Sequence, residues 1–297
     1  MLTITNVNRP ELTIALEPKR FPGGETHPLV DPTVASWPHI RLTAVLKNGD
    51  DVMELLLTTD ALRRLNPDVV LDLYLPYIPY ARQDRVANAG EALGIKVMAN
   101  LINDQYYHTV TVLDSHSNVA LGLIENVVQV PLDKIIRRAY QNTDWTKVVL
   151  VAPDQGAAKK VEELAKALRC PNIVYAVKKR DTLTGKITDT KLLPFPQEYL
   201  AHDWLVVDDI CDGGYTFLEL GKLLRWRSDQ HEVLPEKCGA VRLWITHGIF
   251  SKGYDELRNW YRSIKTTNSC HPTVSGNIRP DRVEDHAYYF FDVKDFV

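Results

Sequence analysis

A pair of acidic residues and a pair of glycines stand close together after one apolar run of the sequence. Asp208 and Asp209 follow Trp204–Val207, and Gly213 and Gly214 come shortly after them. Glycines let backbone N–H groups approach a phosphate closely, and a helix beginning there adds a favourable field. Carboxylates repel phosphate, so the two acids suit ribose hydroxyls or a bridging Mg²⁺. We predict a sugar-phosphate site here; the alternative is a plain strand-to-helix turn with an Asp N-cap.

A basic cluster with a glutamine follows another apolar run. Arg82-Gln83-Asp84-Arg85 comes after Pro76–Tyr80, at the end of the run Val69–Tyr74. Arginine forks and a glutamine amide match a triphosphate and an adenine edge. Taken alone, the cluster fits a solvated surface better, so it becomes a binding hypothesis only together with other segments.

His116 and Asp154 also sit where strands are expected to end. His116, in Asp114-Ser115-His116, follows Thr109–Leu113, and this place favours a catalytic or metal-linked role. Asp154 follows Val148–Ala152, where it fits a cation ligand and a helix N-cap equally well. A serine-hydrolase reading is excluded because no G-x-S-x-G motif occurs.

A basic triplet, Lys178-Lys179-Arg180, follows the strand-like run Ile173–Val177. Cations at a strand end can neutralise charge that develops on a transferring phosphoryl group, although a solvated strand edge is the commoner explanation. Neither a G-x-x-x-x-G-K-[ST] motif nor a G-x-G-x-x-G motif is present. If ATP binds, it binds by other means.

The composition is that of a globular protein of mixed charge, with 297 residues, 35 Lys and Arg, and 38 Asp and Glu. The net charge of -3 argues against a whole-molecule field that recruits nucleic acid, so we expect no nucleic-acid partner. The 4 cysteines show no C-x-x-C spacing, which favours a reducing cytoplasm over a disulfide framework or a zinc site. We expect no signal peptide, no membrane span and a cytoplasmic location.

Short Val-rich runs alternate with helical patterns along the chain. Ala157–Leu168 and Phe217–Leu224 read as amphipathic helices, and Gly90–Asn103 as a third helix after a loop. Strand followed by helix, repeated, is typical of mostly parallel sheets with helices on their faces, whose ligands bind at the carboxyl ends of the strands. The pattern occurs twice, so we predict an α/β fold with two similar domains, 1–130 and 131–297. We expect the last ~25 residues to pack back on the body of the protein, on the N-terminal domain.

Taken in chain order, these segments resemble those of the ribose-phosphate pyrophosphokinase family. The resemblance covers most of the chain. Arg20–Glu25 is similar to a family loop that contacts adenine, often across a subunit interface, and Tyr80–Arg85 is similar to the ATP-binding segment. Other similar segments are Asp114-Ser115-His116, Pro153–Gly156, Lys179-Arg180, Val207–Thr216 and Thr246–Ser251.

The resemblance implies two phosphoribosyltransferase-like domains with the active site between them, assembled as a homo-oligomer. It implies transfer of the β,γ-diphosphoryl group of Mg-ATP to the 1-hydroxyl of ribose 5-phosphate, giving phosphoribosyl pyrophosphate and AMP. It further implies ATP binding by Phe21, Gly23, Glu25, Arg82, Gln83, Asp84 and His116, and Mg²⁺ binding by His116 and Asp154. Ribose 5-phosphate would be held by Asp208, Asp209, Asp212, Gly213, Gly214, Tyr215 and Thr216, and catalysis would rest on Lys179, Arg180 and His116.

The chain departs from the family at the sugar-phosphate loop, which usually reads Asp-Thr-Gly-Gly-Thr. Gly213 lacks the hydroxyl of that threonine, and Tyr215 puts an aromatic ring in place of a glycine. A larger acceptor that contains ribose 5-phosphate, such as ADP-ribose, is therefore an alternative substrate. A phosphoribosyltransferase and a non-catalytic regulatory relative are further alternatives. The first has no use for Arg82–Arg85, and the second has no need of Lys179.

Overall fold

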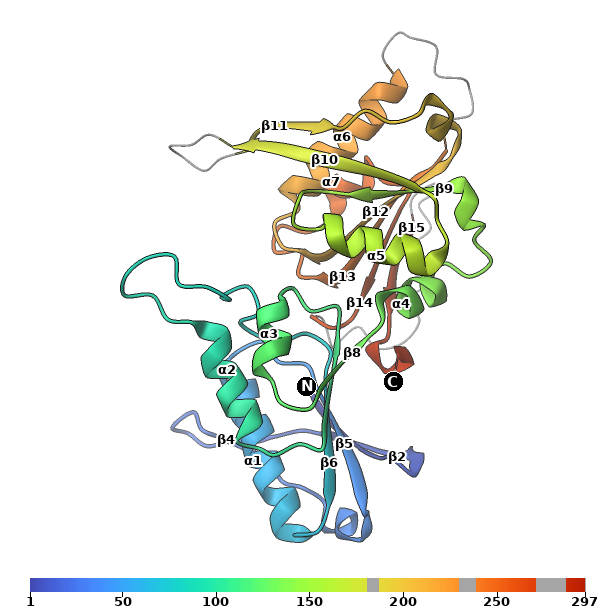
Figure 1. Ribbon diagram of the computed structural model, residues 1–297. Helices are drawn as coiled ribbons and strands as arrows, with labels where there is room; N and C mark the ends of the chain where they lie inside the picture. The colour runs from blue at the N-terminus through green and yellow to red at the C-terminus, as the bar shows by residue number, and fades with distance from the viewer. Residues whose placement is uncertain (181–186, 230–238, 271–286, 297) are drawn as a thin grey trace. The chain divides into compact units, whose positions relative to one another are not determined.

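Two separate β-sheets organise the chain, one in each of two compact units (Figure 1). The computed structural model describes residues 1–180, 187–229, 239–270 and 287–296. The first unit is built mainly from Met1–Pro131, and the second mainly from Leu132–Asn268 together with the C-terminal tail. None of the helices within these described ranges is both long and apolar enough to cross a membrane.

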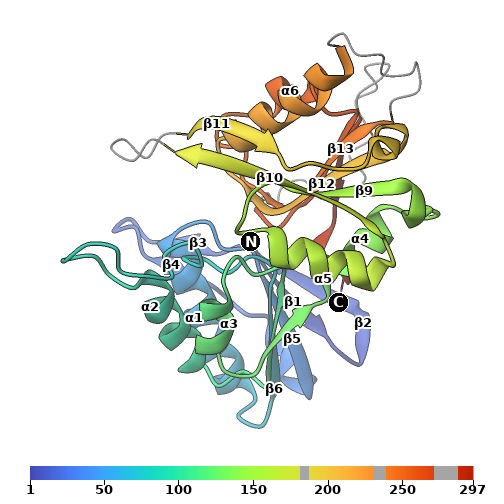
Figure 2. The same ribbon diagram turned by 45° about the horizontal axis from the view of Figure 1, so that its top comes forward.

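The first unit has a six-stranded sheet in which the four strands from β5 to β8 run parallel and β1 and β2 add an antiparallel edge. Helices α1, α2 and α3 lie on the same side of this sheet (Figures 1 and 2). In sheet order the strands are β2 (Arg9–Leu16), β1 (Leu2–Asn6), β5 (His39–Ala44), β6 (Val70–Leu75), β7 (Thr109–Leu113) and β8 (Val127–Val130). The other elements are the hairpin β3 (Lys19–Arg20) and β4 (Thr26–His27), η1 (Pro32–Ser36), α1 (Gly49–Leu65), α2 (Gly94–Asn103) and α3 (Asn118–Leu123).

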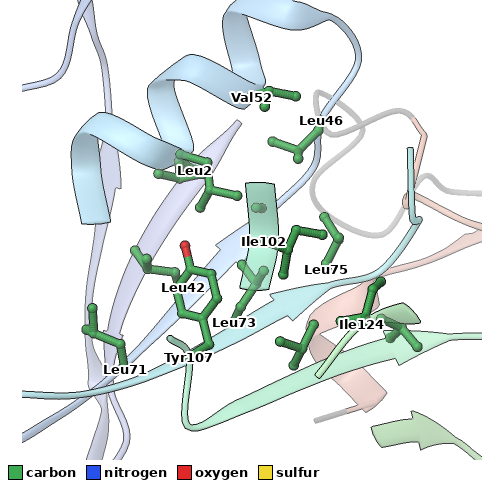
Figure 3. Packing of buried hydrophobic residues seen from close by; sticks show 14 of the residues in the cluster. Leu2, Leu42, Leu46, Val52, Leu71, Leu73, Leu75, Ile102, Tyr107 and Ile124 are labelled. Atoms are coloured by element: carbon green, nitrogen blue, oxygen red, sulfur yellow. The ribbon is translucent and has the colours of Figure 1, made fainter. Parts of the chain in front are cut away.

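Apolar side chains from strands and helices meet between this sheet and its helices (Figure 3). Leu42 and Leu73 are fully buried on neighbouring strands, and Ile102 packs against them from α2. Leu46 and Val52, which flank the start of α1, belong to the same cluster. The core therefore extends to the carboxyl ends of β5 and β6.

The second unit has a seven-stranded sheet, parallel from β10 to β15, with β11 antiparallel at one edge. Helices α5 and α6 cover its opposite faces (Figure 2). In sheet order the strands are β11 (Ile187–Leu192), β10 (Asn172–Arg180), β9 (Val148–Ala152), β12 (Asp203–Cys211), β13 (Val241–Gly248), β14 (Ser263–Thr267) and β15 (Ala287–Phe291). The helices are α4 (Leu132–Ala139), η2 (Trp145–Lys147), α5 (Ala158–Leu168), η3 (Gln197–Ala201), α6 (Tyr215–Asp229), α7 (Asp255–Arg258) and η4 (Val293–Phe296).

The predicted fold class, two α/β domains with mostly parallel sheets, is confirmed. Three local expectations change. The helix expected from Gly90 begins at Gly94, because residues 90 to 93 form a turn and coil. The strand expected to end at Val207 continues to Cys211, because β12 pairs with β13 along that length. The tail, expected on the first domain, adds β15 to the sheet of the second unit.

Candidate active site

Three carboxylates lie near one another at the carboxyl end of the second unit's sheet. Val206 of β12 is opposite Val151 of β9, and continuing this parallel register brings Asp208 and Asp209 level with Asp154. Sequence reasoning placed the two neighbouring acids after the strand, whereas both lie within β12. The side chain of Asp154 also accepts a hydrogen bond from the backbone N–H of Ala157, 3.2 Å away, at the start of α5.

A lysine that the sequence did not point to neutralises one of these acids. The Nζ atom of Lys160 lies 2.8 Å from Oδ2 of Asp209, and the Asp209 side chain is only 10% exposed. Lys160 is in the first turn of α5, just after the strand end that carries Asp154. In the sequence, Lys160 belongs to the polar stripe of an amphipathic helix, so only the packing of α5 against the sheet reveals its contact.

Asp208 is the carboxylate whose charge is least compensated. Burial raises its pKa well above the ordinary value, and the negative charges of Asp209 and Asp154 raise it further. A ligand that brings hydroxyl donors or a cation to this carboxylate would relieve that cost. The cluster is therefore suited to sugar hydroxyls or to a metal ion.

The donor chemistry of this cluster fits Mg²⁺ in one specific way. Within the described ranges, no three His, Cys, Asp or Glu side chains are grouped so that they alone could hold a metal ion. Mg²⁺ commonly takes one or two carboxylates and completes its shell with water and substrate phosphates. Asp154 and its neighbours can provide such a partial set, so a metal here would be shared with a bound polyphosphate.

The predicted sugar-phosphate loop, Asp212–Thr216, is held in shape by the turn that follows β13. Oγ of Ser251 donates to Oδ1 of Asp212 over 2.6 Å, and the backbone N–H of Ser251 donates to the Asp212 carbonyl over 3.1 Å. Gly214 has a φ of 77°, which side-chain-bearing residues rarely adopt, and its carbonyl accepts from Leu218 at the start of α6. The loop therefore presents the N-terminus of a 15-residue helix, whose dipole favours an anion.

Lys252 is a second cation that the sequence reasoning missed. A Cβ atom added at Gly213 would lie 3.6 Å from Cδ of Lys252, so the lysine stem passes beside the backbone of the loop. A side chain at this position would begin at ordinary van der Waals distance from the stem. The nearby Tyr215 is 55% exposed.

In the first unit, the Arg82 segment lines a cavity. Arg82 and Gln83, together with Tyr80 and residues of the β5–α1 connection, surround a space of ≈ 540 Å³. Tyr80 has a φ of 63°, an uncommon backbone conformation for a bulky residue outside a functional turn. Asp84 is half-buried next to this segment and does not line the cavity.

The predicted adenine loop is the tip of the β3–β4 hairpin. Phe21 is 55% exposed, and Arg20 ties the hairpin to the first turn of α1 through a 2.7 Å ion pair with Asp50. The carboxylate of Glu25 lies beside Gly23, 2.6 Å from where a Cβ atom would stand. The hairpin thus offers an exposed aromatic ring on an anchored support.

His116 is exposed at the end of β7. Asp114 beside it is buried with a φ of 35°, and Ser117 caps α3 by accepting a hydrogen bond from Val119. The backbone on both sides of the histidine is therefore fixed by local structure. Sequence reasoning predicted this strand end as the place of a functional histidine.

The predicted catalytic pair Lys179 and Arg180 lies at the end of β10, where the backbone of Lys179 is opposite Asp189 of β11. The sequence predicted that the strand ends at Val177, but it continues through these residues because β11 pairs antiparallel with it. Residues 181–186, including Asp181, lie outside the described ranges.

The structure thus brings the predicted residues together in two groups. In the second unit Asp154, Asp208 and Asp209 gather at the carboxyl ends of neighbouring strands, and the loop Asp212–Thr216 continues directly from one of these strands. In the first unit Arg82 and Gln83 share one cavity, while Phe21 and His116 belong to the β3–β4 hairpin and the β7–α3 connection.

Comparison with known proteins finds a matching domain in each part of the chain. Residues 12–105 match the N-terminal domain of ribose phosphate pyrophosphokinase, and residues 126–230 match the phosphoribosyl transferase domain. The ribose-phosphate pyrophosphokinase of Cereibacter sphaeroides is 30% identical over 241 residues, which are 78% of this chain and 67% of that protein. The enzyme of that name from Thermococcus kodakarensis is 28% identical over 271 residues, 88% of each protein.

A solved structure agrees in fold. The phosphoribosylpyrophosphate synthetase from Mycobacterium smegmatis is similar with a TM-score of 0.70 at 20% identity, over 95% of this chain and 87% of that one. At this identity the structural match supports only the fold. The domain matches and the relatives of similar sequence support the family. The chain belongs to the ribose-phosphate pyrophosphokinase family.

Proposed function

We propose that this chain forms phosphoribosyl pyrophosphate and AMP from ATP and ribose 5-phosphate, as an ATP-dependent diphosphotransferase. Membership of the ribose-phosphate pyrophosphokinase family supports the assignment of this reaction. The observation that carries the proposal is the carboxylate cluster of the second unit beside a glycine loop that opens α6. Such a pairing suits a ligand with vicinal hydroxyls at one end and a phosphate at the other.

In the proposed acceptor site, Asp208 and Asp209 accept hydrogen bonds from the ribose hydroxyls. The 5-phosphate lies against the backbone N–H groups of Asp212–Thr216, where the start of α6 favours an anion. The ammonium of Lys252, whose stem passes the loop at Gly213, adds a positive charge near this phosphate. The ion pair with Lys160 holds the Asp209 carboxylate in place.

In the proposed donor site, Arg82 and Gln83 bind ATP in the cavity of the first unit, next to Asp84 in the chain. His116 joins them from the end of β7, the parallel neighbour of β6. The exposed Phe21, with Gly23 and Glu25 in its hairpin, supports a homo-oligomer in which this loop reaches the adenine of a neighbouring subunit. The oligomer and a cytoplasmic location remain predictions.

Asp154 and His116 are the residues proposed to hold Mg²⁺, together with substrate phosphates. When bound, the ion offsets negative charge on the polyphosphate. Because the carboxylates of the second unit leave a metal shell incomplete, binding of the ion and of ATP should be coupled.

In the proposed reaction, the 1-hydroxyl oxygen of the sugar forms a bond to the β-phosphorus of ATP while the bond from that phosphorus to the α,β-bridging oxygen breaks. AMP leaves with that oxygen, and the hydroxyl proton is lost to solvent. Positioning and charge stabilisation supply most of the rate enhancement in such transfers. We assign charge stabilisation to Lys179 and Arg180 from their place at the end of β10.

The test is a mass-spectrometric assay with ATP, Mg²⁺ and either ribose 5-phosphate or ADP-ribose. Formation of AMP together with phosphoribosyl pyrophosphate is the expected result. The exposed Tyr215 makes ADP-ribose a second candidate acceptor, and faster turnover with it would reassign the substrate. Base-dependent release of pyrophosphate, without AMP formation from ATP, would point to a phosphoribosyltransferase instead.

A further inference from the structure

The cavity of the first unit has one wall that no predicted ATP-binding segment supplies. This wall comes from the connection between β5 and α1, through Leu46, Lys47 and Asn48. The same cavity is lined by Arg82 and Gln83, which come from the connection after β6. Because β5 and β6 are parallel neighbours, both connections leave the sheet at the same edge.

The position of Lys47 is fixed by its backbone. Its N–H donates to the carboxylate of Asp51 over 2.6 Å, and the N–H of Asp51 donates to the side chain of Asn48 over 3.0 Å. These two bonds cap the start of α1, with Asn48 as the N-cap residue. The Lys47 side chain is exposed and has no part in them, so its ammonium is available to a ligand without cost to the helix.

The chemistry of the lining suits a nucleotide better than a sugar phosphate. Leu46 and Val52 are buried and connect the cavity to the core of the unit (Figure 3). The half-buried Tyr77 and the exposed Tyr80 add aromatic surface. None of the lining residues, all of which are in the described part of the chain, is acidic. Apolar and aromatic surface can pack against a nucleotide base, and cationic side chains can bind its phosphates. The carboxylates suited to ribose hydroxyls lie in the second unit instead.

We infer that the β5–α1 connection is part of the ATP site and that the Lys47 ammonium binds the polyphosphate together with Arg82. The inference rests on the proposed function, since it takes ATP as the ligand of this cavity. A space of ≈ 540 Å³ falls within the range of small-molecule pockets, roughly 300 to 1,000 Å³. Lys47 thereby becomes a substrate-binding residue located well upstream of the Arg82 segment.

The experiment compares the full-length chain with Lys47→Gln, Lys47→Arg and Arg82→Gln. Equilibrium binding of ATP and the KM values for ATP and ribose 5-phosphate are measured for each. A charged hydrogen bond to phosphate is worth enough that Lys47→Gln should weaken ATP binding about tenfold or more. The KM for ribose 5-phosphate should stay within about twofold, and Lys47→Arg should keep most of the affinity because it retains the charge.

The matched control is Arg64→Gln, which removes one positive charge from the last turn of the same helix. Arg64 is 77% exposed and pairs with Asp60, so its loss should leave ATP affinity and folding unchanged. The inference is overturned if Lys47→Gln binds ATP like the wild type while Arg82→Gln does not. It is also overturned if Lys47→Gln alters only the response to added inorganic phosphate, because the cavity would then be an effector site.

Failure of the proposed function looks different from either result. In that case neither the wild-type chain nor the Lys47 variants would form AMP from ATP and ribose 5-phosphate. Thermal unfolding of each variant, measured alongside, separates lost binding from lost folding.

Discussion

The Lys160 ammonium of α5 lies 2.8 Å from the carboxylate of Asp209 on β12, and the two side chains are 24% and 10% exposed. This contact links α5, the helix that follows β9, to the acidic residues of the neighbouring strand β12. It converts one carboxylate of a crowded trio into a neutral pair. The charge of Lys160 also acts on Asp208, but burial and the negative charges of Asp209 and Asp154 outweigh it and raise the pKa of Asp208.

Replacing Lys160 by methionine should therefore harm both stability and acceptor binding. Asp209 would be left buried without its cation, at a cost of about 2 kcal/mol in the free energy of unfolding, less than for fully buried pairs because water reaches the lysine. Chemical denaturation and the KM for ribose 5-phosphate give the two readouts. The control is Lys159→Met, since Lys159 is 80% exposed and lies 3.9 Å from Glu163. Equal effects of the two substitutions would contradict the role of the ion pair.

Asp208→Asn should stabilise the protein and impair the enzyme. The raised pKa of Asp208 means that holding its charge in the folded state costs free energy at neutral pH, and the amide removes that charge. The amide oxygen can still accept the hydrogen bond from the backbone N–H of Asp209, now 2.9 Å long. Asp203→Asn on the same strand should instead destabilise the protein, because it removes the 2.7 Å ion pair between Asp203 and Arg242. Melting temperatures and kcat/KM test both, and a lower melting temperature for Asp208→Asn would refute the argument.

The sequence predicts the functional edge of each sheet well because the strands concerned are short, Val-rich runs. Thr109–Leu113 and Val148–Ala152 are strands with these bounds, and the connections after them carry the predicted site residues His116 and Asp154. The sequence could not reveal Lys160, since a lysine on the polar stripe of a helix normally faces water. Its contact follows from the register of β9 against β12.

The cavity of the first unit was hidden for a related reason. Strand β5 (His39–Ala44) has polar residues between its apolar ones, and α1 carries two threonines on its buried side. Neither segment therefore shows the regular spacing of apolar residues that identifies a strand or a helix in a sequence. Without these two elements, nothing in the sequence brings Lys47 to Arg82. The neighbouring β5–β6 pairing is what joins them at one cavity.

Lys252→Gln should weaken binding of the acceptor without changing the donor site. If the ammonium beside Gly213 holds the 5-phosphate, its loss should raise the KM for ribose 5-phosphate about tenfold while the KM for ATP stays the same. Steady-state kinetics with each substrate varied in turn measure this. Lys147→Gln, at a 78% exposed lysine of the same unit, is the charge-matched control. An unchanged KM for the sugar phosphate would remove Lys252 from the site.

Lys179→Ala should lower kcat by about 10²-fold or more, because a lost electrostatic contact to the transferring group is worth roughly 3 kcal/mol. Binding of ATP and ribose 5-phosphate in the ground state should change little. Single-turnover measurement of AMP formation separates this effect from product release. Lys178→Ala, at the neighbouring residue of β10, is the control. A turnover equal to that of the wild type would show that the end of β10 has no catalytic role.

Lys265 makes the stability of the second unit depend on pH. Its ammonium lies 2.6 Å from the carbonyl of Ala139 and 3.9 Å from the ring centre of Tyr140, and burial lowers its pKa to about 8, with a smaller effect from the positive charge of Arg242. Between pH 8 and the ordinary lysine value of 10.5, the unfolded chain therefore binds more protons than the folded one.

The free energy of unfolding should accordingly rise as the pH increases from about 8 towards 10, relative to Lys265→Met, which cannot titrate. Urea denaturation of both proteins at several pH values in this window measures the difference. The rise should be smaller than the full pKa shift implies, because water reaches part of the lysine. A difference that is flat over this range would mean that Tyr140 and the Ala139 carbonyl offset the burial and keep the ammonium charged.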